Sequence, residues 1–339
     1  MKLVATTEAV GHVLCHDLTQ IIKGEYKDAR FRKGHVVTEA DIPVLLSMGK
    51  AHLYVWELVP GMVHENDAAA RLAALCRNEN MEASAVKEGK IELSAACDGL
   101  FRVDSQRLLA VNSVEDLMIA TRHGNTAVRR GDKLAGTRVI PLIIAEEKLR
   151  EAEAAAGETP LLELLPFTLK TAAIVTTGSE VKNGLIADTF TPVVRDKLAS
   201  YGIETIAQMN SGDGVDAVAE GIAQMRKTGA SMIVCTGGMS VDPDDNTPGG
   251  IQKSGADIVT YGAPVLPGAM FLLGYYDDGT VVMGLPGCVM YAGATVFDLV
   301  LPRVAAGLRL ARRDFVAMGE GGLCLGCKPC HWPNCPFGK

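Results

Sequence analysis

Two glycines and a group of aspartates directly follow an apolar run in the second half of the chain. The stretch reads V-C-T-G-G-M-S-V-D-P-D-D-N-T-P and spans residues 234–248. Because they lack Cβ atoms, Gly237 and Gly238 let backbone amides approach a ligand closely and hold an anion. Asp242 and Asp245 carry hard carboxylate oxygens, which suit a Mg²⁺ ion that bridges to a phosphate. The same residue types form ordinary turns, so a ligand site and a plain loop are both open.

A second polar loop follows another apolar run earlier in the chain. It reads T-T-G-S-E-V-K-N-G-L-I-A-D-T-F over residues 176–190 and contains Gly178, Ser179, Glu180 and Asp188. Glu180 taken alone is typical of a solvated loop residue. The two loops can act on one ligand only if the fold brings the ends of their apolar runs together.

Strand and helix patterns alternate from Phe167 to Arg313, which predicts such a fold. We expect strands at 171–177, 203–209 and 231–236, helices at 191–202 and 213–229, a hairpin near 277–279 and a helix from about Met290. Thr191 is the expected N-cap of the first helix. The pattern predicts an α/β fold, a three-layer α/β/α arrangement with a mostly parallel sheet. Loops at the carboxyl ends of parallel strands converge on a ligand crevice.

Residues 1–160 show a different, α+β pattern. Strands are expected at 11–18, 51–59 and 139–145, and a helix at 146–157. A turn at Asp98-Gly99 predicts a hairpin between residues 91–97 and 100–103. The chain therefore divides into an α+β region at 1–160, an α/β domain at 167–313 and a cysteine-rich tail at 321–339.

The overall composition narrows the classes of partner. The chain has 339 residues, 48% of them hydrophobic, and a formal net charge of −7. A mildly acidic chain has no general attraction for nucleic acid or anionic lipid, and no apolar stretch is long enough to span a bilayer. Without a recognisable signal peptide, we expect a cytoplasmic protein.

The domain at 167–313 resembles the molybdopterin-binding domain of molybdenum cofactor biosynthesis proteins. Four motifs carry the resemblance in order: T-T-G-S-E-V, G-L-I-A-D-T-F, C-T-G-G-M-S-V-D-P-D-D-N-T-P and G-L-P-G-C-V-M-Y-A-G. Each motif alone is weak, but the four in order are specific. Cys288 and Val289 depart from the family's Asn-Pro in the last motif, and Asp242 stands where relatives carry glycine.

The resemblance implies a ligand and a set of site residues. Molybdopterin or adenylated molybdopterin would bind with Mg²⁺ and molybdate, and a molybdoenzyme or another biosynthesis protein would be the partner of a self-associating chain. Asp188, Asp245 and Glu180 would be catalytic, and Asp242 and Asp245 would hold the metal. The implied cofactor-binding residues are Thr177, Gly178, Ser179, Thr236, Gly237, Gly238, Met239, Ser240, Thr247, Pro286 and Gly287.

Molybdenumtransferase-like processing of the pterin is the favoured activity. Residues 1–160 resemble the amino-terminal part of that transferase in the stretch F-R-K-G-H-V-V-T-E-A-D-I-P-V-L-L-S-M-G-K-A-H-L-Y-V, although its S-A-M-D-G-Y stretch is missing and no room follows Arg313 for its carboxyl-terminal barrel. Two alternatives stay open. One is a non-enzymatic molybdopterin carrier or sensor, and the other is a nucleotide pyrophosphatase of the competence-damage type.

The tail at 321–339 carries a compact cysteine pattern. The pattern is Cys-x₂-Cys-x₂-Cys-x₄-Cys, formed by Cys324, Cys327, Cys330 and Cys335. A proline follows the last cysteine. Ferredoxin-type clusters use such short spacings, whereas structural zinc sites separate two cysteine pairs by a longer loop. The spacing favours a [4Fe–4S] cluster over Zn²⁺, for which His331 offers a further ligand. Unliganded thiols are the third alternative.

Overall fold

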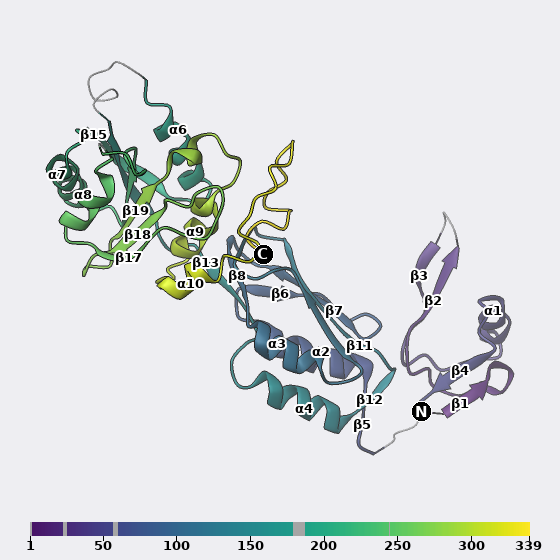
Figure 1. Cartoon of the computed structure of the whole chain (residues 1–339). Coiled ribbons are helices and arrows are strands. Elements are labelled where there is room, and N and C mark those ends of the chain that lie inside the picture. Colours follow the sequence, from purple (N-terminus) through teal and green to yellow (C-terminus); the bar gives the residue numbers. More distant parts are fainter. Residues whose placement is uncertain (1, 23–25, 57–59, 179–186, 244) are drawn as a thin grey trace. The chain divides into compact units, whose positions relative to one another are not determined.

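The computed structural model describes residues 2–22, 26–56, 60–178, 187–243 and 245–339 (Figure 1). The chain forms two compact units. Unit 1 comprises residues 1–96, 103–122 and 131–163, and unit 2 comprises residues 97–102, 123–130 and 164–339.

Unit 1 is built from small antiparallel sheets and short helices. Its elements are β1 (Lys2–Ala5), η1 (Thr6–Glu8), β2 (Leu18–Ile22), β3 (Tyr26–Phe31), α1 (Asp41–Ser47), β4 (His52–Val55), β5 (Met62–His64), α2 (Glu65–Cys76), β6 (Met81–Ala83), β7 (Lys90–Ala95), α3 (Ser105–Asn112), β9 (Leu117–Thr121), β11 (Lys133–Val139), β12 (Ile143–Ala145) and α4 (Glu146–Ala156). Strands β6, β7, β11 and β9 form one antiparallel sheet in that order. The α+β character predicted for this region is thus seen in the structure.

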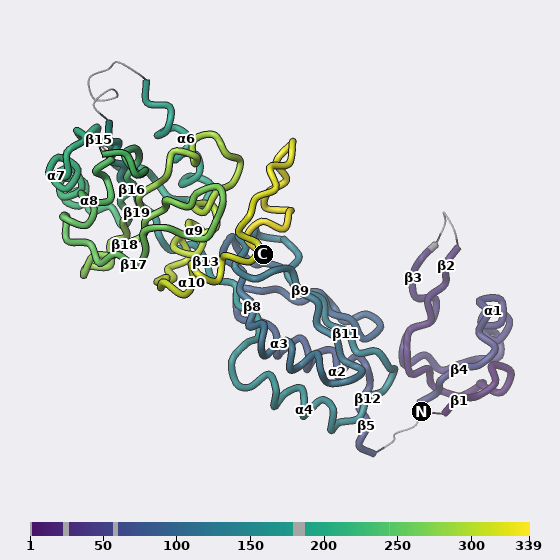
Figure 2. Tube along the Cα trace, viewed as in Figure 1, coloured from purple at the N-terminus to yellow at the C-terminus, as the bar shows by residue number. Residues whose placement is uncertain are grey.

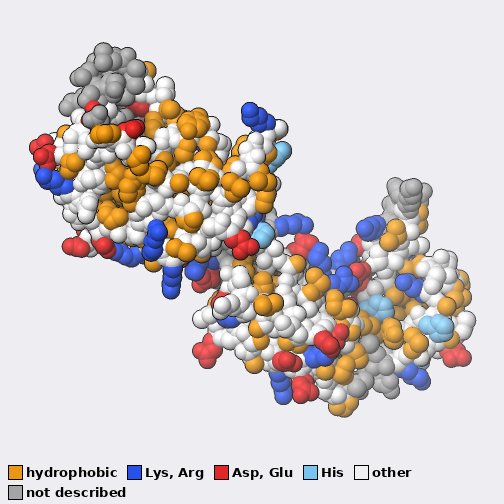
Figure 3. Space-filling view, in the orientation of Figure 1, with side chains coloured by type: hydrophobic (Ala, Val, Ile, Leu, Met, Phe, Trp, Pro, Cys, Tyr) orange, Lys and Arg blue, Asp and Glu red, His pale blue; other side chains and the backbone are white. Residues whose placement is uncertain are grey.

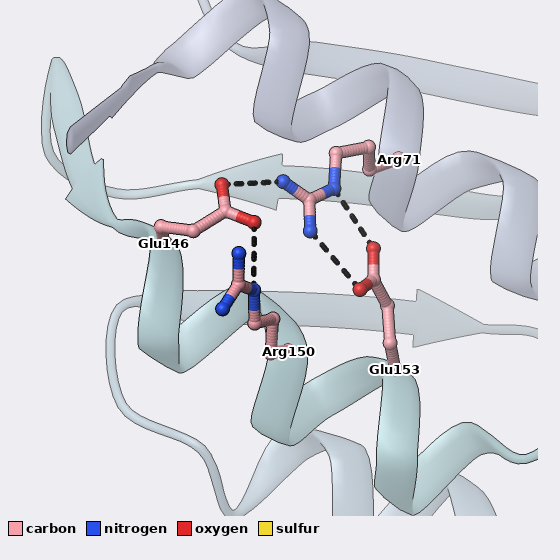
Figure 4. A network of polar contacts seen from close by, with 4 residues as sticks. All are labelled: Arg71, Glu146, Arg150 and Glu153. Carbon is pink, nitrogen blue, oxygen red and sulfur yellow. Dashed lines mark hydrogen bonds and ion pairs between the residues drawn. The ribbon is translucent and has the colours of Figure 1, made fainter. Parts of the chain in front are cut away.

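An ion-pair network links α2 to α4 (Figure 4). The guanidinium of Arg71 donates from Nη1 to Glu146 at 2.8 Å and from Nε to Glu153 at 2.8 Å. Arg150 donates to the other oxygen of Glu146 at 3.2 Å. These side chains are partly exposed, so water screens each pair and the network adds little stability. The apolar face of α2, which includes Leu72, supplies the buried contacts of this part of the unit.

The hairpin predicted around Asp98-Gly99 is wrong. Strand β7 pairs with β6 and β11, whereas β8 (Gly99–Val103) pairs with β10 (Thr126–Val128) and lies next to β13 (Leu162–Pro166) in a separate sheet. The Asp98 carboxylate accepts a hydrogen bond from the Arg130 amide at 2.8 Å, which turns the chain away from β7. The strand predicted at 11–18 is also largely absent, since only isolated bridges form at Val13 and Leu14.

Unit 2 is organised around a six-stranded sheet with the order β15-β14-β16-β19-β18-β17. Neighbouring strands from β15 to β19 are parallel, and β18 and β17 are antiparallel additions at one edge. Its elements are β14 (Thr171–Thr177), α6 (Phe190–Ala199), β15 (Glu204–Ser211), α7 (Val215–Arg226), β16 (Met232–Thr236), α8 (Thr247–Lys253), β17 (Asp257–Tyr261), β18 (Leu272–Tyr275), β19 (Val281–Leu285), η2 (Gly287–Met290), α9 (Val296–Ala305) and α10 (Arg312–Val316).

Helices cover both faces of this sheet. Alternate residues of a strand point to opposite faces. Ile174 and Val234 therefore pack in one core with the residues of α6 and α9, while Val175 and Cys235 pack in a second core with those of α7 and α8. The predicted three-layer α/β/α architecture with a mostly parallel sheet is confirmed.

Two helix starts differ from the sequence-based expectation. Helix α6 begins at Phe190 with Thr189 at the N-cap position, so Thr191 lies inside the helix rather than at its cap. Helix α9 begins at Val296 instead of Met290, because the Thr295 hydroxyl accepts a hydrogen bond from the Phe297 amide in a capping box. The hairpin expected near 277–279 is present between β18 and β19.

The surface of unit 2 carries apolar side chains as well as charged ones. Apolar side chains gather on the face of the unit shown in Figure 3. The exposed apolar residues of unit 2 include Leu266, Tyr291, Leu323 and Leu325. No helix among the described residues is long and apolar enough to cross a membrane.

Candidate functional site

A cavity of about 350 Å³ opens where β16 and β19 end. Both strands are parallel neighbours, so their carboxyl ends lie at the same edge of the sheet. The cavity is lined by Gly237, Gly238, Met239, Ser240, Asp245, Gly268, Ala269, Met270, Pro286, Gly287 and Cys288. The structure thus brings the T-G-G loop after β16 together with the L-P-G loop after β19.

The paired glycines are required by the backbone of the loop after β16. Gly237 has a φ of 86° and Gly238 a φ of 56°, values that side chains rarely adopt. A Cβ atom on Gly237 would lie 2.5 Å from the carbonyl oxygen of Thr177, and one on Gly238 would lie 2.8 Å from Oγ1 of Thr247. The main chain at this wall of the cavity therefore has no room for side chains.

Three threonines predicted to bind cofactor instead support this loop from behind. Thr177, Thr236 and Thr247 are buried, and none of them lines the cavity. The Thr247 hydroxyl donates to the carbonyl oxygen of Gly237 at 2.8 Å and lies 3.1 Å from the Thr177 hydroxyl. Thr177 Oγ1 in turn lies 3.1 Å from the carbonyl oxygen of Thr236, to which it donates. These hydroxyls hold the glycine turn in shape.

Asp245 is the acidic residue that the structure places at the cavity. Its Oδ2 accepts a hydrogen bond from the Ser240 amide at 2.9 Å, which fixes the carboxylate against the loop. Burial, together with the negative charge of Asp245, raises the pKa of Tyr261, whose hydroxyl donates to the Met239 carbonyl at 3.0 Å. Asp242 is exposed and is not among the lining residues, although its carbonyl accepts from the Asp245 amide.

Asp188 occupies a different position and does not line the cavity. Its Oδ1 accepts from the amides of Phe190 at 3.0 Å and Thr191 at 2.9 Å, the first turn of α6. Its Oδ2 accepts from the hydroxyls of Thr191 at 2.5 Å and Thr176 at 3.3 Å, and from the Gln208 amide group at 3.3 Å. The carboxylate is thus used to cap a helix and to tie it to β14 and β15.

These hydrogen bonds decide the ionisation of Asp188. Burial of the carboxyl group works against ionisation, but the bonds donated by Thr191, Phe190 and Thr176 outweigh it and hold the pKa of Asp188 below its ordinary value. A carboxylate that accepts several hydrogen bonds is stabilised in its charged form. Asp188 therefore stays charged at neutral pH within a fixed set of protein partners.

The remaining residues predicted on the loop after β14 are placed only in part. Gly178 follows β14 with a φ of 130° and is half-buried. Ser179 and Glu180 lie outside the described residues. Gly178 is absent from the lining of the cavity.

Four lining residues were not predicted as site residues from the sequence. Gly268, Ala269 and Met270 precede β18, and Cys288 belongs to η2. Gly268, with a φ of 121°, packs its backbone against Val296, the first residue of α9. The segment 268–270 has no polar side chain, so no motif of chemical groups marks it. Cys288 was visible only as a departure from the family's Asn, and burial raises the pKa of its thiol.

The predicted metal ligands are not gathered around one point. Among the residues that the structure describes, no group of three or more His, Cys, Asp or Glu side chains is arranged to hold a metal ion. Cys324, Cys327, Cys330 and Cys335 lie apart from the cavity at the glycine loop. They line a second cavity of their own, together with His331.

Part of this chain is similar to solved structures of two proteins named for molybdopterin or tungsten cofactor synthesis and of one protein of unknown function. The molybdopterin biosynthesis enzyme MoaB from Thermus thermophilus is 18% identical, with 41% of this chain and 98% of that chain covered and a TM-score of 0.33. The tungsten cofactor synthesizing protein MoaB from Pyrococcus furiosus is 20% identical, with 43% and 98% covered and a TM-score of 0.35. The CinA protein from Thermoplasma acidophilum is 16% identical, with 44% and 99% covered and a TM-score of 0.33.

Family models match two parts of the chain, and no curated protein matches it. Residues 3–57 match a domain of unknown function, DUF8806. Residues 173–306 match the family described as probable molybdopterin binding domain, and they include every residue that lines the cavity at the glycine loop. The α/β domain of unit 2 therefore matches the model of the molybdopterin-binding domain family over residues 173–306.

Proposed function

We propose that unit 2 binds molybdopterin or its adenylated form in the cavity at the ends of β16 and β19, and that the chain processes this ligand as a molybdenumtransferase-like enzyme. One observation carries the proposal. Two loops that are distant in sequence line one cavity. The first contributes Gly237, Gly238 and the Asp245 carboxylate, and the second contributes Pro286 and Gly287. Bare main chain beside a single fixed acid suits a phosphate with its counterion.

The donor set fits Mg²⁺ in the manner usual for phosphate ligands. Mg²⁺ keeps several waters and binds through one or two carboxylates together with substrate phosphates. Asp245 would supply the carboxylate, and Asp242, which lies three residues earlier on the same exposed turn, would supply a second one through water. When bound, the ion would neutralise charge on the phosphate oxygens.

The protein groups would then orient the ligand for cleavage. The glycine turn would hold the phosphate, and the segment 268–270 would contact the apolar part of the pterin. In metal insertion, an oxygen from water would attack the pyrophosphate bond of the adenylated pterin and AMP would leave. The two dithiolene sulfurs would bind the molybdenum of molybdate and displace oxygen, which would leave as water. We propose that residues 1–160 and the α/β domain at 167–313 act in one chain for this purpose, and that it self-associates in the cytoplasm before transfer to a molybdoenzyme.

One observation favours the carrier or sensor function as a second candidate. Asp188, a predicted catalytic acid, is engaged as a helix cap away from the cavity. Asp245 is the one carboxylate among the described lining residues. A site with a single carboxylate can hold a phosphate and its cation without providing a second acid or base for chemistry.

The experiment that tests the proposal is an anaerobic turnover assay of the full chain with adenylated molybdopterin, molybdate and Mg²⁺. We expect AMP release that chelation of Mg²⁺ abolishes. Asp245→Ala should lower the rate by about 100-fold, since about 2.7 kcal/mol is a reasonable loss for a fixed ligand of the cation. Glu220→Ala is the matched control, because Glu220 is an exposed acid on α7 that does not line the cavity, and its rate should fall by less than about 3-fold.

Each alternative has its own signature in the same assay. Tight pterin binding without AMP release would support the carrier or sensor instead. Hydrolysis of ADP-ribose in preference to the pterin would support the pyrophosphatase. Full activity in Asp245→Ala would contradict the assignment of that carboxylate, and a monomeric mass by light scattering would contradict self-association.

A further inference from the structure

The four tail cysteines enclose a separate cavity of about 280 Å³. It is lined by Ala294, Leu323, Cys324, Leu325, Cys327, Cys330, His331, Trp332, Asn334, Cys335, Pro336 and Phe337. All four cysteines of the Cys-x₂-Cys-x₂-Cys-x₄-Cys pattern therefore line one space, although they are spread over twelve residues. The other lining side chains are mostly apolar, which is the setting expected for a group held by sulfur rather than by water.

The tail is fixed at both ends, so this arrangement is not that of a loose terminus. Figure 2 shows the tail running outward and doubling back, and the Gly338 amide donates to the Gly321 carbonyl at 2.9 Å. Leu266 donates to the Gly322 carbonyl and accepts from the Cys324 amide, each at 2.8 Å. Phe337 is buried in the main core of unit 2. Closing the segment into a loop reduces the entropy lost when its cysteines bind one group.

One of the thiols is positioned by close packing on the body of unit 2. A Cβ atom built on Gly293 would lie 2.7 Å from Sγ of Cys330 and 3.0 Å from its Cβ. Only a residue without a side chain leaves this space. The absence of a side chain at position 293 therefore sets where Cys330 stands relative to the other three cysteines.

The spacing of the four cysteines distinguishes the kinds of metal group. Structural zinc sites, which hold four ligand atoms at about 2.3 Å from one ion, usually separate two cysteine pairs by a longer loop. Here the four cysteines follow one another at intervals of three, three and five residues and line one cavity. A cubane accepts one thiolate at each of four iron corners, so its ligands stand farther apart. We propose that Cys324, Cys327, Cys330 and Cys335 bind one [4Fe–4S] cluster in this cavity.

The cluster site shares its supports with the candidate pterin cavity. The main chain of Leu266 forms hydrogen bonds to Gly322 and Cys324 of the tail. The segment from Gly268 to Met270, which begins two residues later, lines the pterin cavity. Likewise Gly293, which packs on Cys330, follows the Pro286–Cys288 wall of that cavity by a few residues. The two cavities share no lining residue, but the same two chain segments support both of them.

The test is anaerobic reconstitution of the full chain with Fe²⁺ and sulfide, followed by metal analysis and visible absorption. We expect about four iron and four acid-labile sulfide per chain, with the brown absorption of a cluster. Cys324→Ser and Cys330→Ser should each lower the iron content several-fold. Cys97→Ser is the matched control, because Cys97 is a partly exposed cysteine outside the tail, and it should keep the full iron content.

A second variant tests the geometry without removing a thiol. Gly293→Ala should displace Cys330 and lower the cluster content, while all four cysteines remain. Gly214→Ala is its control, since nothing lies within 4 Å of a Cβ atom at that position. One zinc per chain with no iron after reconstitution would overturn the proposal, as would an iron content that the tail substitutions leave unchanged. Neither result depends on whether the chain binds a pterin.

Discussion

The loops that follow β14 and β16 carry similar residues, but their carboxylates do different things. Each loop begins with a threonine and a glycine of positive φ and continues to an aspartate. After β14, the carboxylate of Asp188 accepts hydrogen bonds from the first turn of α6. After β16, the carboxylate of Asp245 lines a cavity and is held there by one amide. The first acid stabilises the fold, and the second is available to a ligand.

This difference shows that two loops of similar sequence can have different roles, one supporting the fold and the other lining a cavity. Asp188 has five protein donors around it, whereas Asp245 faces a space large enough for a phosphate-bearing ligand. Thr247 also has a supporting role, since its hydroxyl hydrogen-bonds to the turn whose main chain forms the cavity wall. Substitutions in the two loops should therefore separate stability from binding.

The largest effect is expected from Gly237→Ala in the loop after β16. An alanine here would have to keep the left-handed φ of 86°, and its Cβ atom would lie 2.5 Å from the Thr177 carbonyl oxygen. Backbone strain of this kind costs about 1–3 kcal/mol, and the steric clash adds to it. We expect the free energy of unfolding, measured by urea unfolding, to fall by about 3 kcal/mol. The affinity for molybdopterin, measured by anaerobic titration, should fall as well. Gly214→Ala serves as the control, and equal stability in both variants would contradict the account of the turn.

Asp188→Ala should have the next largest effect, on stability alone. Removing a helix cap costs about 0.5–2 kcal/mol, and leaving the hydroxyls of the buried Thr176 and Thr191 without their acceptor adds to this. We expect a loss of about 2 kcal/mol in urea unfolding with molybdopterin affinity changed less than about 3-fold. Asp188→Asn should keep part of the cap and lose less. A collapse of affinity at full stability would reverse the roles assigned to the two loops.

The acid sensitivity of Asp188 should give the smallest effect. Its folded-state pKa lies below the ordinary value of about 3.9. The charged carboxylate therefore adds stability above that ordinary pKa, and the contribution is lost as the pH falls through the lowered folded value. The stability difference between wild type and Asp188→Asn should thus be larger at pH ~7 than at pH ~3. A difference that stays constant with pH would show that the carboxylate's charge does not contribute.

Much of unit 2 could be predicted because its strands are long, apolar and fully buried. The strand predicted at 171–177 matches β14 residue by residue, and the helix predicted at 213–229 contains α7. The turn at Asp98-Gly99 was misread because a local turn signal does not determine which strands pair. Side-chain hydrogen bonds and backbone packing at Gly99, formed only in the folded chain, decide the partner of β8.

The candidate site was predictable where it depends on motifs and unpredictable where it depends on shape. Seven lining residues belong to the T-G-G and L-P-G motifs and were predicted, among them Asp245. Gly268 and Ala269 contribute only small volume and main chain, and Met270 is an ordinary apolar residue, so nothing in their chemistry marks them. The sequence also could not distinguish Asp188 as a cap, because that role depends on where α6 begins.

Filling the cavity tests the central claim most directly. Ala269 lines the cavity and lies outside every recognised motif. The substitution Ala269→Trp would therefore fill the space while Asp245, Gly237 and Gly238 stay unsubstituted. The measurement is the anaerobic equilibrium titration of molybdopterin into the wild-type chain, Ala269→Trp and the surface control Ala199→Trp. The account predicts at least about 10-fold weaker binding for Ala269→Trp, or about 1.4 kcal/mol, at unchanged thermal stability, and wild-type binding for Ala199→Trp. Wild-type affinity in Ala269→Trp would contradict the claim that molybdopterin binds in this cavity.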